Sequence, residues 1–88
     1  MIRTMIFRLS IHSQLRKEVA EGRLTKLEAR RLTKAVTHKV AAQLLQDVAR
    51  KSGSYPVMES IVQFVIENWA EILKAILIIA SLIGDENE

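Results

Sequence analysis

The stretch Val57–Ile83, VMESIVQFVIENWAEILKAILIIASLI, constrains the fold more than any other part of this chain. On a helix its few polar side chains form one narrow stripe, and the rest of the circumference is aliphatic or aromatic. In the last turns Leu77 and Ile78 interrupt even that stripe. Because such a helix must be covered on several sides, we expect the helix 57–83 to meet a bundle core, a second subunit or a lipid surface.

Because the chain is small, we expect a second subunit to cover the apolar surface of the helix 57–83. A domain of 88 residues buries only about 60% of the surface that its unfolded chain exposes. The chain has no cysteine, so no disulfide can add stability. We therefore expect a homo-oligomer with intertwined subunits. Its predicted interface residues are Phe7, Leu9, Ile11, Trp69, Ile76, Leu77, Ile78 and Leu82.

The N-terminal segment predicts a short β-strand in an otherwise mainly α protein. From Met5 to His12 apolar and polar residues roughly alternate, with Phe7, Leu9 and Ile11 on one side, which is the period of a half-buried strand. A lone strand needs a partner, and the same strand of a second copy would supply it. Three helices are predicted to follow, at about 13–21, 26–51 and 57–83.

Local signals define the ends of these helices. Gly22 suits a left-handed residue after the first helix, Thr25 and Glu28 form a capping box for the second, and Pro56 forces a stop before the third. Within 26–51 the apolar face changes sides near Val40. Either this helix breaks there, or it is straight and passes between two packing partners, and its run of helix-forming residues favours the straight version.

Charge is divided unevenly along the single predicted domain. Residues 1–51 carry twelve Lys and Arg against four acids, a balance of +8, whereas residues 52–88 carry one Lys against six acids, a balance of −5. We divide the domain into a basic strand-helix-helix region (1–53), an apolar C-terminal helix (57–84) and an acidic tail (85–88). This asymmetry indicates a polyanion or a membrane surface as partner, or attraction between the two halves.

The sequence predicts no enzyme, no cofactor and no metal site. His12 and His38 are far apart and match no catalytic or metal-binding spacing, and the serines lack a nucleophile elbow. Arg3 and Arg8 interrupt the only apolar run that could begin a secretory signal, so we expect a cytoplasmic protein.

Nucleic acid is the partner that the basic half predicts. Arg23, Lys26, Arg30 and Lys34 recur at helical spacing, and a cationic face of this kind suffices for phosphate binding. No aromatic residue is interleaved with it, which argues against stacking on single-stranded bases. The predicted nucleic-acid-binding residues are Arg8, Ser10, Arg16, Lys17, Arg23, Lys26, Arg30, Arg31 and Lys34.

The order of strand, short helix, glycine turn and longer helix over residues 5–40 resembles the ribbon-helix-helix repressors. The resemblance implies that two copies pair their strands in the major groove, with Arg8 and Ser10 reaching the bases and Phe7, Leu9 and Ile11 facing the core. Residues 57–83 lie outside it. Two alternatives stay open: an assembly or adaptor protein that binds an acidic protein surface, and a small membrane-associated protein that inserts its C-terminal helix.

Overall fold

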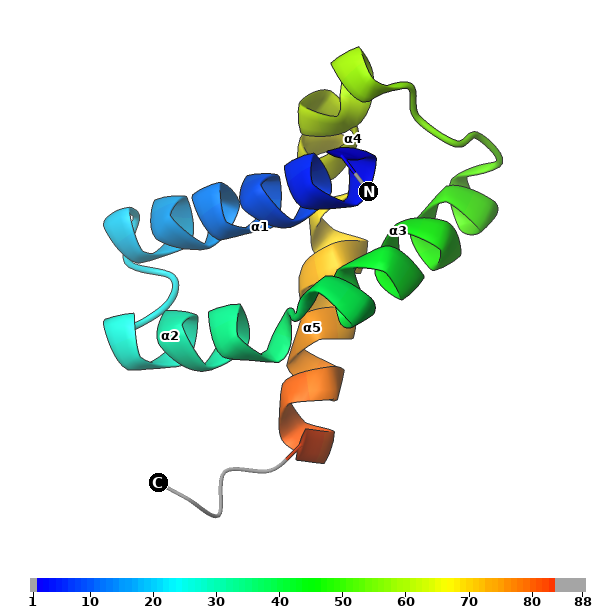
Figure 1. The fold of residues 1–88 in the computed structure, drawn as a ribbon. Coiled ribbons are helices and arrows are strands. Elements are labelled where there is room, and N and C mark those ends of the chain that lie inside the picture. The colour runs from blue at the N-terminus through cyan, green and yellow to red at the C-terminus, as the bar shows by residue number, and fades with distance from the viewer. Residues whose placement is uncertain (1, 84–88) are drawn as a thin grey trace.

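The computed structural model describes residues 2–83, and within them it contains helices but no strand. The elements are α1 (Ile2–Ala20), α2 (Lys26–Ala35), α3 (His38–Ser52), the 3₁₀ helix η1 (Met58–Ser60), α4 (Ile61–Glu67) and α5 (Trp69–Ile83). Helices α1 and α2 form an antiparallel hairpin, α4 and α5 follow one another, and α1 packs across α4 (Figure 1). The mainly α prediction is confirmed, but the predicted elements are not all correct.

The predicted strand at 5–12 is wrong, because these residues lie within the 19-residue helix α1. The buried positions of α1 follow helical spacing, and they are Thr4, Phe7, Ser10, Ile11, Leu15 and Glu18. Phe7 and Ile11 are four residues apart and both buried, whereas Leu9 lies on the opposite, exposed side. Three of these buried residues, Thr4, Ser10 and Glu18, are polar. The positions of the apolar residues alone therefore do not reveal the helical period.

The predicted helix 26–51 is two helices, α2 and α3, separated by Val36 and Thr37. Val36 leaves the helical conformation with φ −91° and ψ 76°, and the Thr37 side chain caps α3 by accepting a hydrogen bond from the Val40 amide at 3.2 Å. The Arg8 Nε donates to the Val36 carbonyl at 2.8 Å, which satisfies a backbone acceptor near the break. The break explains why the apolar face changes sides along this segment.

Replacing Thr37 by alanine is expected to lower the free energy of unfolding by about 1 kcal/mol, because it removes the N-cap acceptor of α3. Urea unfolding followed by circular dichroism measures this loss. A serine at the same position keeps the hydroxyl and should recover most of the stability. Equal stability of Thr37→Ala and the wild type would show that the cap contributes nothing.

The predicted helix 57–83 is interrupted as well. Asn68 separates α4 from α5, with φ −109° and ψ 20°, and its side-chain amide donates to the Phe64 carbonyl at 2.9 Å. The capping box of Thr25 and Glu28 is confirmed, and Gly22 has the left-handed φ of +79° that its position predicts. Local capping signals were therefore more reliable than the long apolar run.

The core lies between α1, α3, α4 and α5, and α2 contributes Leu32 to it. Its buried members are Phe7, Ile11, Leu15, Leu32, Val36, Ala41, Leu44, Leu45, Val48, Ala49, Ile61, Phe64, Val65, Ile72 and Ile76. The rings of Phe7 and Phe64 lie at a tilt with their centroids 6.3 Å apart, which joins α1 to α4. None of the helices between residues 2 and 83 combines the length and the apolar character that crossing a membrane requires.

Candidate nucleic-acid interface

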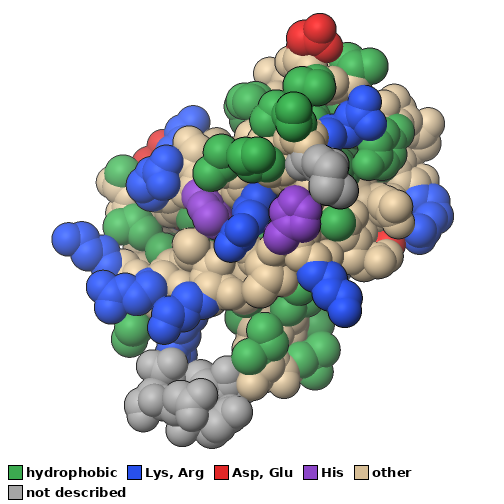
Figure 2. All heavy atoms as spheres, in the orientation of Figure 1, with side chains coloured by type: hydrophobic (Ala, Val, Ile, Leu, Met, Phe, Trp, Pro, Cys, Tyr) green, Lys and Arg blue, Asp and Glu red, His purple; other side chains and the backbone are tan. Residues whose placement is uncertain are grey.

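Two stripes of basic residues run along the α1–α2 hairpin. Arg8, His12 and Arg16 recur every four residues on α1, and Lys26, Arg30 and Lys34 do the same on α2. We call these six residues the basic hairpin face. Figure 2 shows one side of the molecule with Lys and Arg side chains over both helices, both histidines between them, and acidic side chains only near the edges. The hairpin therefore presents positive charge from two adjacent helices.

The end of α1 fixes where the two stripes lie relative to each other. Gly22, at φ +79°, ends α1 in a Schellman motif: its amide donates to the Val19 carbonyl at 3.1 Å, and the Arg23 amide donates to the Glu18 carbonyl at 2.9 Å. The capping box then starts α2 within a few residues, through hydrogen bonds between Thr25 and Glu28 of 2.8 and 3.0 Å. This short, well-capped joint brings Lys26 and the rest of the α2 stripe back alongside α1.

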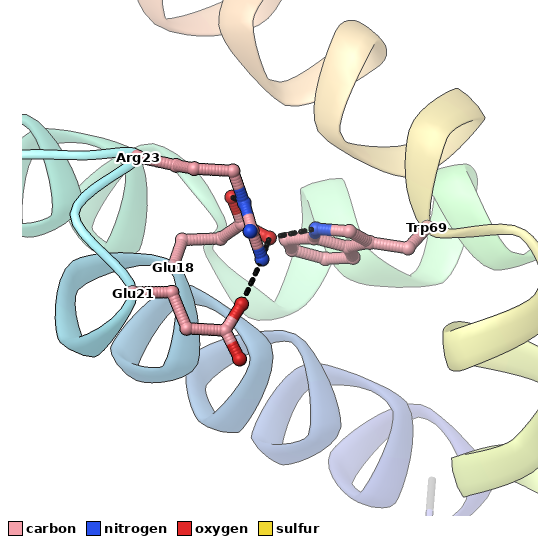
Figure 3. A network of polar contacts seen from close by, with 4 residues as sticks. All are labelled: Glu18, Glu21, Arg23 and Trp69. Carbon is pink, nitrogen blue, oxygen red and sulfur yellow. Dashed lines mark hydrogen bonds and ion pairs between the residues drawn. The ribbon is translucent and has the colours of Figure 1, made fainter.

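A polar network holds this joint against α5 (Figure 3). The Arg23 guanidinium donates two hydrogen bonds to the Glu18 carboxylate, at 2.8 and 3.2 Å, and also pairs with Glu21. The indole Nε1 of Trp69, at the start of α5, donates to Glu18 Oε2 at 3.1 Å. Because Glu18 is buried, these donors are what make its charged form tolerable. Arg23, mainly through its bonds to Glu18, lowers the pKa of that carboxyl.

The acids of the hairpin do not neutralise its basic face. Between residues 2 and 46 the only acids are Glu18, Glu21 and Glu28. Glu18 and Glu21 bind Arg23, and Glu28 accepts from the Thr25 backbone amide, so all three are engaged at the joint. The same contacts with Glu18 and Glu21 raise the pKa of Arg23. Within residues 2–83, the structure contains no ion pair between the two stripes and an acid.

His12 lies between two arginines of its own stripe. Burial is the main cause that lowers the pKa of His12 from its ordinary value of 6.5, and the positive charges of Arg8 and Arg16 lower it further. At neutral pH the imidazole is therefore uncharged, and the charge of the α1 stripe comes from the two arginines. His12 is not among the predicted nucleic-acid-binding residues. Its spacing of four residues from both arginines is the signal that places it within the stripe.

The structure distributes the nine predicted nucleic-acid-binding residues over different environments. Five are exposed on the helices α1 and α2, namely Arg16, Lys17, Lys26, Arg30 and Lys34. Arg8 and Arg31 are half-buried, Ser10 is buried in α1, and Arg23 is engaged by Glu18 and Glu21. These five exposed residues all lie on the solvent-facing side of α1 or α2. The expectation that Arg8 and Ser10 reach DNA bases from a β-ribbon is wrong, because both residues lie within the helix α1.

The predicted oligomer-interface residues also separate into two groups. Phe7, Ile11 and Ile76 are fully buried within the chain, and Trp69 is half-buried and bonded to Glu18. The other four are exposed, and they are Leu9, Leu77, Ile78 and Leu82.

Among residues 2–83, no three His, Asp or Glu side chains come together in a way that could hold a metal ion. The site offers basic side chains on two adjacent helices for contact with anions. Comparison with known proteins returned no match: no family model fits the chain, and no curated protein or solved structure is significantly similar to it.

Proposed function

We propose that this protein is a non-enzymatic nucleic-acid-binding protein that contacts phosphates with its basic hairpin face. The observation that carries the proposal is the pair of cationic stripes on adjacent antiparallel helices, whose nearby acids are all engaged at the joint. From its first to its last residue each stripe advances eight residue steps, or about 12 Å of helix. That length matches roughly three to four base-pair steps along a duplex, each with a phosphate on either strand.

The aromatic residues favour phosphate contacts over base stacking. The chain has two Phe, one Trp and one Tyr. Both phenylalanines are buried, Trp69 is bonded to Glu18, and the Tyr55 ring lies under the Arg3 guanidinium at 5.3 Å. None of these rings belongs to the two stripes. Phosphate contacts carry no sequence information by themselves, so the proposed binding is driven by charge and depends weakly on base sequence.

Fluorescence anisotropy with a labelled duplex, measured between about 50 and 200 mM salt, tests this proposal. Five exposed cations on the hairpin lead us to expect that the logarithm of the binding constant falls with the logarithm of salt concentration, with a slope of roughly −4. Exchanging Lys26, Arg30 and Lys34 for glutamine should weaken binding and reduce the size of that slope by about 2–3.

A charge-matched control comes from basic residues of α3 and α5. Exchanging Arg50, Lys51 and Lys74 for glutamine removes the same net charge from α3 and α5, and we expect a much smaller loss of affinity. Lys51 is paired with Glu71 at 2.9 Å, and Arg50 with Asp47 at 3.4 Å. If both triple variants weaken binding equally, net charge rather than the hairpin face is responsible. Absence of binding at the lowest salt, or binding that salt does not affect, would refute the proposal.

A further inference from the structure

The C-terminal half of α5 is an apolar surface that this chain does not cover. Ile72 and Ile76 face the core and are fully buried. Beyond them, Leu77, Ile78 and Leu82 are 48%, 52% and 79% exposed, and Figure 1 shows this part of α5 extending past the other helices. Together with Ile83 we call these residues the α5 end. A contiguous group of exposed apolar side chains often marks an interaction site.

A second apolar surface is concave. Helices α1 and α4 enclose a shallow groove of about 180 Å³, which has Leu9, Val62 and Ile66 on its walls and the buried Val65 below them. The three wall residues are 56%, 54% and 47% exposed. Ser10, Ser13 and Gln14 complete the lining on the α1 side. We call this the α1–α4 groove, and its dimensions suit the side chains of one apolar helix turn.

The α5 end cannot fill the groove of its own chain. Val62 and Ile66 belong to α4, which leads through Asn68 directly into α5. Sixteen residues separate Ile66 from Leu82, which is about 24 Å along a helix. Figure 1 shows α5 leading away from α4, so the groove and the α5 end lie toward opposite ends of the molecule. Only another molecule can bring a convex apolar end into this groove.

Charge favours a second copy of this chain as the molecule that binds in the groove. One turn beyond Ser13 and Gln14, α1 carries the exposed cations Arg16 and Lys17. The sequence that follows α5, Gly84-Asp85-Glu86-Asn87-Glu88, supplies three carboxylates in five residues. An anionic membrane would repel this acidic sequence next to the apolar end, whereas the α1 side of the groove attracts it.

We propose that the α5 end of one copy docks into the α1–α4 groove of a second copy, with the acidic sequence after α5 beside Arg16 and Lys17. The contact is heterologous, because each copy contributes a different surface. Every copy therefore retains one free end and one free groove after a single contact. Such head-to-tail association continues into a chain of copies, or closes into a ring if the rotation allows it.

Light scattering coupled to gel filtration tests this proposal with two single variants. Val62→Lys disables the groove and leaves the α5 end intact, whereas Leu82→Lys does the reverse; both positions are more than half exposed, so the fold should persist. We expect the mass of the wild type to rise with concentration, and each variant alone to run near the chain mass of 10.0 kDa. An equimolar mixture should form a dimer and stop there, because it contains one working end and one working groove.

Several outcomes would overturn head-to-tail docking. A monomeric wild type at every concentration, or a mixture that stays monomeric, would exclude it. If one variant alone still assembles, the other surface pairs with itself about a two-fold axis. If wild type floats with anionic liposomes and Leu82→Lys does not, lipid covers the α5 end.

Circular dichroism checks that both variants are folded. If Leu82→Lys is not folded, Ile78→Ser serves as a second α5-end variant. The Lys26, Arg30 and Lys34 glutamine variant should assemble like wild type, which separates this inference from the proposed function.

Discussion

Replacing Phe7 by alanine is expected to lower the free energy of unfolding by about 3–5 kcal/mol. The Phe7 side chain is fully buried, and its ring packs against Phe64 at a centroid separation of 6.3 Å. Truncation removes that contact and leaves a cavity between α1 and α4. Small domains have a total stability of about 5–15 kcal/mol, so this one substitution should leave a substantial part of the protein unfolded at physiological temperature.

Leu9→Ala is the matched control for Phe7→Ala. Leu9 lies two residues further along α1, is 56% exposed, and should lose no more than about 0.5 kcal/mol. Urea unfolding followed by circular dichroism measures both variants under the same conditions. A strand over residues 5–12 would put both side chains on one face and make the two losses similar. Similar losses would therefore contradict the helical assignment of α1, and a large difference would support it.

The misassigned strand shows where a sequence pattern is insufficient. Over Phe7, Leu9 and Ile11, alternation and a helical repeat share two of three positions, because Phe7 and Ile11 are one helical turn apart. The buried positions over the whole of α1 follow a helical repeat and would distinguish a helix from a strand. That repeat, however, includes the buried polar residues Thr4 and Ser10. A search for apolar periodicity passes over such positions. Their burial depends on how α1 packs against α4, which the sequence of α1 alone does not contain.

The helix breaks were harder to predict than the helix starts. The Thr25 capping box and the left-handed Gly22 were predictable because both involve residues within one turn of each other. The break at Val36 and Thr37 depends partly on Arg8, which is 28 residues away and donates to the Val36 carbonyl. Helix propensity favours continuing through such a position. Tertiary contacts such as this one favour the break between α2 and α3 instead.

The basic hairpin face was more predictable than the network that supports it. Lys26, Arg30 and Lys34 are spaced so that any helix presents them together, and they are exposed on α2 as their spacing indicates. Arg23 lies three residues before Lys26, which is also a helical spacing, yet its charge is paired with Glu18 and Glu21. Trp69, which completes the network, is 51 residues from Glu18 in sequence. No local pattern connects them.

Replacing Glu18 by alanine is expected to lower the free energy of unfolding at pH 7 by about 1–3 kcal/mol. The buried carboxylate accepts hydrogen bonds from both Arg23 and Trp69, so its removal leaves the half-buried indole N–H without its acceptor. The Arg23 side chain is 57% exposed and can return to water, which limits the loss. Glu59→Gln, on the exposed η1 helix, is the control and should change stability little.

The dependence of stability on pH should change in the Glu18→Gln variant. Hydrogen bonding to Arg23 is the main cause that holds the pKa of Glu18 below its ordinary value of 4.5, against the opposing effect of burial. The unfolded chain therefore binds this proton more readily than the folded one does. The stabilisation is fully present above pH 4.5 and is lost as the pH falls through the lowered pKa. Glu18→Gln removes this contribution, so its acid-induced loss of stability should be shallower than that of wild type. Identical slopes would mean that Glu18 does not titrate in the way its partners predict.

A double-mutant cycle distinguishes a connected network from two independent contacts to Glu18. Trp69→Phe keeps an aromatic ring against the hairpin joint but removes the indole N–H that donates to Glu18 Oε2. If the indole bond helps to hold the carboxylate in place for Arg23, the losses from Trp69→Phe and Glu18→Gln should not add, and a coupling of about 0.5 kcal/mol or more is expected. Strictly additive losses would show that Trp69 contributes by packing alone. In that case α5 would hold the hairpin through its apolar contacts, and the orientation of the basic face would not depend on the buried carboxylate.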